Sequence, residues 1–169
     1  MQKDDELVSL LNQAKYLYLR HISEPRDNSL RLVVEEAVET QSNAKSTKAL
    51  AAQLPEIAEI LTGAQSIESA DECKRFEIQW NQYVAYLVTE ELAGSGGKYE
   101  DEVYEGKLLR RYTKSHFLYH LSRDTGSHTG PILHYKLICL NHLIDVAAYQ
   151  PPEIRLLGTI SESREIKPN

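Results

Sequence analysis

The segment from Cys73 to Glu91 constrains the fold most, because apolar side chains recur in it at every second position. The pattern begins in FEIQW (76–80) and continues through residues 84–88. A period of two is that of a β-strand with one buried face, and aromatic and β-branched residues pack well on a pleated surface. A two-residue hairpin turn at Asn81-Gln82 would need positive φ, which Gln does not favour. Because the alternation passes this point without a change of phase, we predict one long strand.

The amino-terminal segment has the spacing of a helix instead. Its apolar residues between Leu7 and Ile22 largely recur at intervals of three and four. Asp4 or Asp5 can cap the amino end of such a helix, and Pro25 stops it. We therefore predict an amphipathic helix, which needs the surface of a sheet to lie on.

Further segments predict strands with short connections and one more helix. Residues 30–39 alternate with a period of two, residues 107–113 resemble a short strand, and Ser115 can cap a short helix over residues 116–124. Helices and strands do not alternate as in a doubly wound fold. We predict an α+β fold, a mainly antiparallel sheet with the amino-terminal amphipathic helix and the short second helix packed on it. Residues 1–169 fit a single domain, with a frayed tail from about residue 159.

The apolar run LICLNHLIDVAAY (137–149) carries Cys139, His142 and Asp145 at three-residue steps. On a helix these three side chains would lie on one side, within reach of one another, as in a nucleophilic site. On a strand His142 would face away from the other two. The residues between 133 and 149 fit both periods, but their β-branched and aromatic content favours a strand. We predict a strand and no catalytic residues, and the helix stays open as the alternative.

Composition excludes several classes of function. The formal net charge is −6, which disfavours nonspecific binding to nucleic acid or to an anionic membrane. A small basic cluster downstream of residue 106 is the one candidate for nucleic-acid binding, and the global charge opposes it; it consists of Lys107, Arg110, Arg111 and Lys114. The start of the chain has no signal-peptide core, and no apolar run approaches the ~20 residues of a membrane span. Cys73 and Cys139 are predicted to be buried free thiols, so we expect a cytoplasmic protein.

Two local motifs resemble known sites but lack essential residues. GSGGK (94–98) has Leu92 where a phosphate-binding loop needs its first glycine and Tyr99 where it needs a hydroxyl beside the lysine. His116 and His120 have the spacing of metal ligands, but on a helix they share a solvated face with Arg123, which would repel a cation. We predict neither a metal site nor a cofactor.

Acidic residues bracket the glycine-rich loop that follows residue 91. If the loop folds back, they form a negative surface that can steer a basic protein partner. This candidate partner-binding set consists of Glu90, Glu91, Glu100, Asp101, Glu102 and Glu105. The spacing is not that of a calcium-binding loop.

Three stretches resemble an uncharacterised family of small bacterial proteins of unknown function. They are FEIQWNQYVAYLVTEE (76–91), YEGKLLRRYTKSHFLYHL (104–121) and HYKLICLNHLIDVAAYQPPEI (134–154), and the likeness covers residues 73–154. The resemblance implies a single-domain bacterial protein and transfers no catalytic residues.

No complete catalytic motif is present, and the chain contains ten tyrosines, which suit half-buried contact surfaces. We therefore predict a non-enzymatic, cytosolic bacterial interaction module, immunity-like or regulatory, that holds a protein partner through the acidic loop and a tyrosine-bearing sheet. Enzymatic activity is left open. The alternative is a small enzyme or ligand-binding domain whose pocket is lined by Glu36, Tyr83, Tyr86, His134 and His142.

Overall fold

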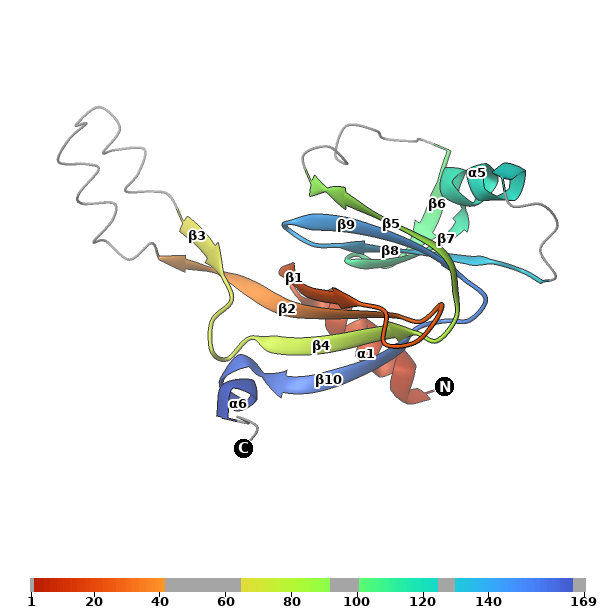
Figure 1. Ribbon diagram of the computed structural model, residues 1–169. Helices are drawn as coiled ribbons and strands as arrows, with labels where there is room; N and C mark the ends of the chain where they lie inside the picture. The colour runs from red at the N-terminus through yellow and green to blue at the C-terminus, as the bar shows by residue number, and fades with distance from the viewer. Residues whose placement is uncertain (1, 42–64, 92–100, 125–129, 166–169) are drawn as a thin grey trace, which may run out of the picture.

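The computed structural model describes residues 2–41, 65–91, 101–124 and 130–165, and it places two antiparallel sheets face to face (Figure 1). The mainly antiparallel architecture is confirmed, but the predicted one sheet is in fact a sandwich of two. In the first sheet the strand order is β1-β2-β4-β10, and a short strand β3 extends it along the end of β2. These strands are β1 (Tyr16–Ser23), β2 (Leu30–Gln41), β3 (Gln65–Glu68), β4 (Lys74–Trp80) and β10 (Glu153–Thr159).

The second sheet has the order β5-β9-β8-β7-β6. Its strands are β5 (Tyr83–Glu90), β6 (Val103–Glu105), β7 (Leu109–Lys114), β8 (Leu133–Ile138) and β9 (His142–Ala148). Three helices accompany the sheets: α1 (Gln2–Gln13), α5 (His116–Asp124) and α6 (Ile160–Glu165). In Figure 1, α5 lies over the second sheet on the side away from the first sheet.

The core fills the space between the sheets. The first sheet contributes Phe76, Ile78 and Trp80, all almost fully buried. The rings of Trp80 and Tyr135 meet across the interface, with centroids 6.1 Å apart. Alternate positions of every central strand therefore face this core, which is the arrangement expected of an aligned sandwich.

Residues 73–91 form two strands in different sheets, contrary to the one long strand that we predict from the alternation. β4 pairs with β2 and β10, whereas β5 pairs with β9, and the chain changes sheets at the exposed residues Asn81 and Gln82. Alternation indicates which side chains face a core, but it does not identify the neighbouring strand. The alternation of apolar residues therefore continues unbroken when the chain passes from the core-facing side of one sheet to the core-facing side of the other.

The amino-terminal helix is shorter than predicted. α1 ends at Gln13, and β1 begins at Tyr16. Leu17 and Leu19 point into the core while Tyr16 and Tyr18 are half-buried, so this part follows the period of two. The leucines of this segment fit the period of a helix as well as that of a strand, and the predicted helix therefore extends too far.

Asn12 joins α1 to the start of β7. Its Oδ1 accepts hydrogen bonds from the backbone N–H groups of Lys107, Leu108 and Leu109, at 2.9, 2.7 and 3.0 Å. The Lys107 ammonium donates to the Ala14 carbonyl oxygen at 2.7 Å. One amide side chain thereby satisfies three consecutive backbone donors.

Residues 133–149 are β-structure, as predicted, but they form the hairpin of β8 and β9 rather than one strand. The turn of this hairpin also covers the outer edge of β1. Leu140 N–H donates to the Leu17 carbonyl oxygen at 2.8 Å, and the Asn141 amide makes two 3.0 Å hydrogen bonds with the backbone of Leu19. The turn thus links the two sheets through backbone groups that an edge strand would otherwise expose.

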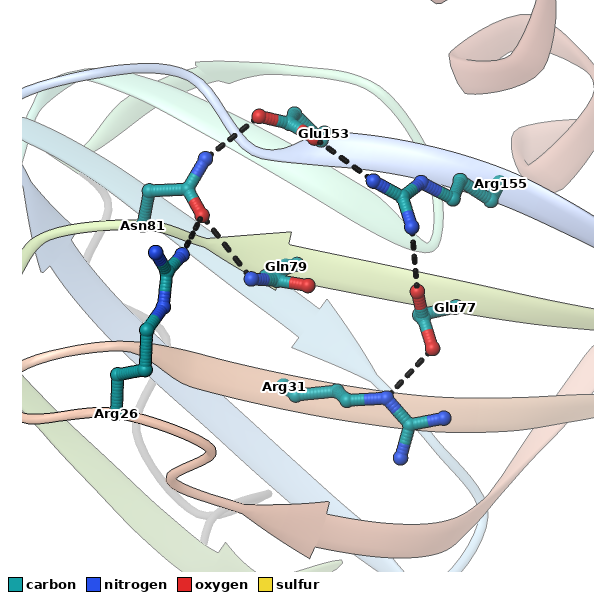
Figure 2. A network of polar contacts seen from close by, with 7 residues as sticks. All are labelled: Arg26, Arg31, Glu77, Gln79, Asn81, Glu153 and Arg155. Carbon is teal, nitrogen blue, oxygen red and sulfur yellow. Dashed lines mark hydrogen bonds and ion pairs between the residues drawn. The ribbon is translucent and has the colours of Figure 1, made fainter.

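Polar side chains cross-link the outer face of the first sheet, as Figure 2 shows. Glu77 of β4 accepts from Arg31 of β2 at 2.5 Å and lies 3.5 Å from a guanidinium nitrogen of Arg155 of β10. Asn81 accepts hydrogen bonds from Arg26 and Gln79. Because each carboxylate in this network has a cationic or amide partner, the buried position of Glu77 is accounted for by the fold alone.

At the carboxyl end, where we predict a frayed tail from about residue 159, the structure places α6. Ile160 is buried, and its N–H donates to the Cys73 carbonyl oxygen at 3.0 Å. Residues 166–169 lie outside the described part of the chain.

Replacing Asn12 tests the junction between α1 and β7. Asn12→Ala leaves three N–H donors without their acceptor, so we expect the free energy of unfolding to fall by about 2 kcal/mol. Urea denaturation of the full chain measures this change. Gln13→Ala, at an exposed neighbour, is the control and should change stability by less than about 0.5 kcal/mol. An equal effect of both substitutions would contradict the role assigned to Asn12.

Candidate functional site

The best-defined polar site lies on the outer face of the second sheet, under the amino end of α5. β7 ends at Lys114, Ser115 follows, and α5 begins at His116. The Ser115 hydroxyl caps this helix, because its Oγ accepts a hydrogen bond from the Leu118 N–H at 3.2 Å. The predicted cap at Ser115 therefore agrees with the structure.

Ser115 is also the first member of a buried hydrogen-bond chain. Its Oγ lies 2.7 Å from Nδ1 of His134 on β8, and Nε2 of His134 lies 2.9 Å from Oδ1 of Asp145 on β9. Lys136 approaches the second carboxylate oxygen of Asp145 at 3.3 Å. We name Ser115, His134 and Asp145 the Ser–His–Asp chain. Its three side-chain types are those of a nucleophile, a general base and an orienting carboxylate.

The geometry fixes the protonation pattern of His134. Ionised Asp145 only accepts hydrogen bonds, so the Nε2 that faces it carries a proton. In the neutral ring, Nδ1 is then the acceptor for the Ser115 hydroxyl. The order of the two ring nitrogens is the reverse of that in the Ser–His–Asp proteases, where Nε2 faces the serine.

Two aromatic rings hold the imidazole in place. Tyr112 stacks on His134 with ring centroids 4.4 Å apart, and the ring of Phe117 lies 5.0 Å away. Only 2% of the surface of His134 is exposed. Burial also raises the pKa of the Tyr112 hydroxyl, and neighbouring Arg110 partly opposes this shift. The two rings and the burial therefore fix the orientation of the imidazole between Ser115 and Asp145.

A pocket of about 360 Å³ opens beside Ser115. Its lining consists of Asp101, Glu102, Lys114, Ser115, His116 and Tyr119. This volume lies within the range of ~300–1,000 Å³ that is typical of small-molecule sites.

Charges in the pocket neutralise one another. Asp101 accepts from His116 at 2.7 Å and lies 3.1 Å from the Lys114 ammonium. Hydrogen bonds from His116 and then from Lys114 lower the pKa of Asp101 to about 2. Glu102 accepts from the backbone N–H of His116 at 2.9 Å, at the positive end of α5.

Large apolar side chains stand exposed in and beside the pocket lining. Tyr119 of the lining is 63% exposed, and on β6, next to the lining residue Glu102, Val103 is 55% and Tyr104 45% exposed. Elsewhere in the described residues, Leu87 on β5 is 50% and Leu156 on β10 is 44% exposed. We name the region formed by residues 101–105, Lys114, His116 and Tyr119 the β6–α5 surface.

The acidic partner-binding set falls in two places. Glu90 is the last residue of β5 and Glu91 follows it, whereas Asp101, Glu102 and Glu105 lie at β6, which is the opposite edge of the same sheet. Glu100 lies outside the described residues. Glu105 faces Arg111 at 3.7 Å, so most of the acidic side chains near β6 have cationic partners.

The alternative pocket residues take part in separate contacts. Glu36 accepts from the backbone N–H of Lys74 on the first sheet, and Tyr86, which packs edge-to-face on Tyr83, donates to Glu24 at 2.9 Å. His134 belongs to the Ser–His–Asp chain. Nδ1 of His142 is buried, and no partner for it lies within the described residues. The structure thus does not bring these five side chains into one pocket.

The hairpin also separates the thiol of Cys139 from the imidazole of His142. Cys139 belongs to the core between the sheets, and burial raises the pKa of its thiol to about 12. The contact between the two residues is a backbone hydrogen bond, from the Cys139 N–H to the His142 carbonyl oxygen at 2.9 Å. A neutral, buried thiol is a poor nucleophile. Asp145 pairs with His134 instead.

Across residues 2–41, 65–91, 101–124 and 130–165, no three His, Cys, Asp or Glu side chains are grouped so that they could hold a metal ion. Within the same ranges, no helix is long and apolar enough to cross a membrane.

The Ser–His–Asp chain is not apparent from the sequence, because its members come from three segments. His134 and Asp145 are eleven residues apart, and they become neighbours through the β8–β9 register, in which Lys136 opposes Asp145 and His134 opposes Ala147. A hairpin that turns at residues 139–142, with Ile138 opposite Leu143, places both side chains on one face, one pair apart. That hairpin is the signal that could have identified them.

No protein-family model, curated protein or solved structure matches the chain. The resemblance to a family of small bacterial proteins therefore stays a prediction.

The double role of Ser115 predicts a measurable stability loss. Ser115→Ala removes the cap of α5 and leaves Nδ1 of buried His134 without a donor, so we expect unfolding to become easier by about 2 kcal/mol. Ser115→Asn should retain more stability, because Asn caps helices as well as Ser does and its amide can donate to Nδ1. Ser122→Ala, at an exposed position of the same helix, is the matched control for urea denaturation.

The burial of Cys139 predicts resistance to thiol reagents. At pH 8 the raised pKa keeps this thiol protonated, and Cys73, whose pKa burial also raises, is protected in the same way. We expect a disulfide-exchange reagent to label neither cysteine in the folded chain and both cysteines in urea. Rapid labelling of Cys139 without unfolding would contradict its place in the core.

Proposed function

We propose that the chain is a protein-interaction module that binds a protein partner through the β6–α5 surface. The observation that supports this proposal is the exposure of Tyr119 in the pocket lining and of Val103 and Tyr104 on β6, which directly follows the lining residues Asp101 and Glu102. Burying such side chains against a partner is favourable, and tyrosine is enriched at the centres of protein interfaces.

The electrostatics of the surface refine the kind of partner. Asp101, Glu102 and Glu105 supply negative charge, but Lys114, His116 and Arg111 lie against them. A surface with balanced charge does not select a strongly basic protein. We propose a partner that contributes apolar side chains at its centre and both signs of charge at its rim, with weak dependence of affinity on salt.

We place this binding in the bacterial cytoplasm, in a regulatory or immunity-like role. Support comes from Cys73 and Cys139, which are both free thiols, as is usual in a reducing compartment.

Site-specific photo-cross-linking tests the proposed surface. A photoreactive phenylalanine analogue replaces Tyr119 or, as the control, Leu156 of β10, which is 44% exposed in the other sheet. In cells that produce the full chain, we expect the Tyr119 position to give one discrete adduct with another protein and the Leu156 position to give none. Adducts of the same mass from both positions, or from neither, would contradict the proposal.

Once the partner is purified, truncating the tyrosines measures their contribution. We expect Tyr119→Ala to weaken binding about tenfold or more, since buried interface tyrosines typically contribute above 1 kcal/mol. Leu156→Ala should leave the dissociation constant unchanged. Titration calorimetry at low and moderate salt provides both values.

A further inference from the structure

We propose that Ser115 is a nucleophile that cleaves small carboxylic esters in the pocket beside α5, with His134 as its general base and Asp145 as a positioning residue. This activity goes beyond partner binding and does not depend on it, because the reacting groups all belong to this chain.

The first support is the direction of the hydrogen bonds. Nε2–H of His134 faces Asp145 at 2.9 Å, so Nδ1 is the free acceptor 2.7 Å from the Ser115 Oγ. A base within this distance of the hydroxyl can take its proton as the oxygen attacks. The imidazolium that forms is stabilised by Asp145, whose second oxygen faces Lys136.

The second support is the buried position of the His134 imidazole in the Ser–His–Asp chain. A helix cap needs only the hydroxyl of Ser115, which already accepts from the Leu118 N–H. Lys136 and His134 pair with the buried Asp145 carboxylate, as the arginines pair with Glu77 in the first sheet. The cap does not account for the imidazole, which is 2% exposed and joins Ser115 to Asp145 through its two ring nitrogens.

The third support is access for a substrate. Ser115 lines the pocket of about 360 Å³, which is large enough for a short acyl ester. In the same lining, Lys114 pairs with Asp101 and Glu102 accepts from the His116 N–H, so the charges around the pocket balance one another.

The reaction consumes one water and needs no other co-reactant. Ser115 Oγ forms a bond to the carbonyl carbon while its proton moves to Nδ1 of His134. The bond from that carbon to the leaving alcohol oxygen then breaks, and the alcohol takes the proton from Nδ1. Water next attacks the acyl-serine, His134 receives the water proton, and Ser115 regains it as the carboxylic acid leaves.

A fluorophosphonate probe tests the nucleophile without knowledge of the natural substrate. Attack by Ser115 forms an Oγ–P bond and releases fluoride, so the folded chain should gain the mass of one adduct. Peptide mapping should place this adduct on Ser115. The Ser122→Ala variant should react at the wild-type rate, and Ser115→Asn, which keeps a capping side chain, should not react at all.

Replacing Asp145 separates a positioning role from a structural one. Asp145→Asn should slow labelling about a hundredfold or more. Plotted against pH, the labelling rate of the wild-type chain should follow a single ionisation. Asp145→Asn should move the pH midpoint of that ionisation, whereas the loss of a merely structural contact would leave the midpoint unchanged. Urea denaturation establishes that each variant is folded.

Absence of an adduct on the folded wild-type chain would overturn the proposal, as would an adduct on any other residue. A labelling rate unchanged in Asp145→Asn would equally overturn it. Mapping the wild-type adduct decides the matter even where a variant fails to fold. The fluorophosphonate probe needs no partner, so absence of labelling would not change the cross-linking result at Tyr119. Absence of cross-linking at Tyr119 would likewise leave the labelling of Ser115 unchanged.

Discussion

The β8–β9 hairpin is the element on which the rest of the structure depends, because it is buried on both faces. Its inner side chains, among them Leu137, Ile144 and Val146, belong to the core between the sheets. Its outer side chains, His134 and Asp145, lie under α5. Its turn covers the edge of β1. A strand buried on both faces has a nearly unbroken apolar run, which explains the sequence LICLNHLIDVAAY.

Sequence periodicity predicts most strands of this fold but not their partners. The alternation in residues 76–80 and 84–88 locates the inward side chains of β4 and β5, yet it contains nothing about the change of sheet at Asn81. In the amino-terminal segment, Leu17 and Leu19 satisfy a helical spacing and a strand spacing together. Only the burial of alternate residues in β1 decides between them, and burial depends on the second sheet.

The candidate site is harder to predict than the fold, since its contacts join distant segments. Ser115 is identifiable as a helix cap from its neighbours alone. His134 and Asp145 are conspicuous polar residues in an apolar run, but their pairing needs the hairpin register. The acidic residues show the same limit of prediction. Asp101 belongs to a segment that is negative in the sequence, but in the fold its carboxylate pairs with Lys114 of β7 and His116 of α5.

The two-residue link at Asn81 and Gln82 carries the chain directly from β4 into β5, so the two sheets are neighbours in sequence as well as in space. The pocket beside Ser115 lies on the outer face of the second sheet, whereas β4 faces the core from the first sheet. The β8–β9 hairpin supplies side chains both to the core and to the Ser–His–Asp chain. An engineer who repacks the interior therefore disturbs the pocket least at positions of the first sheet such as Ile78.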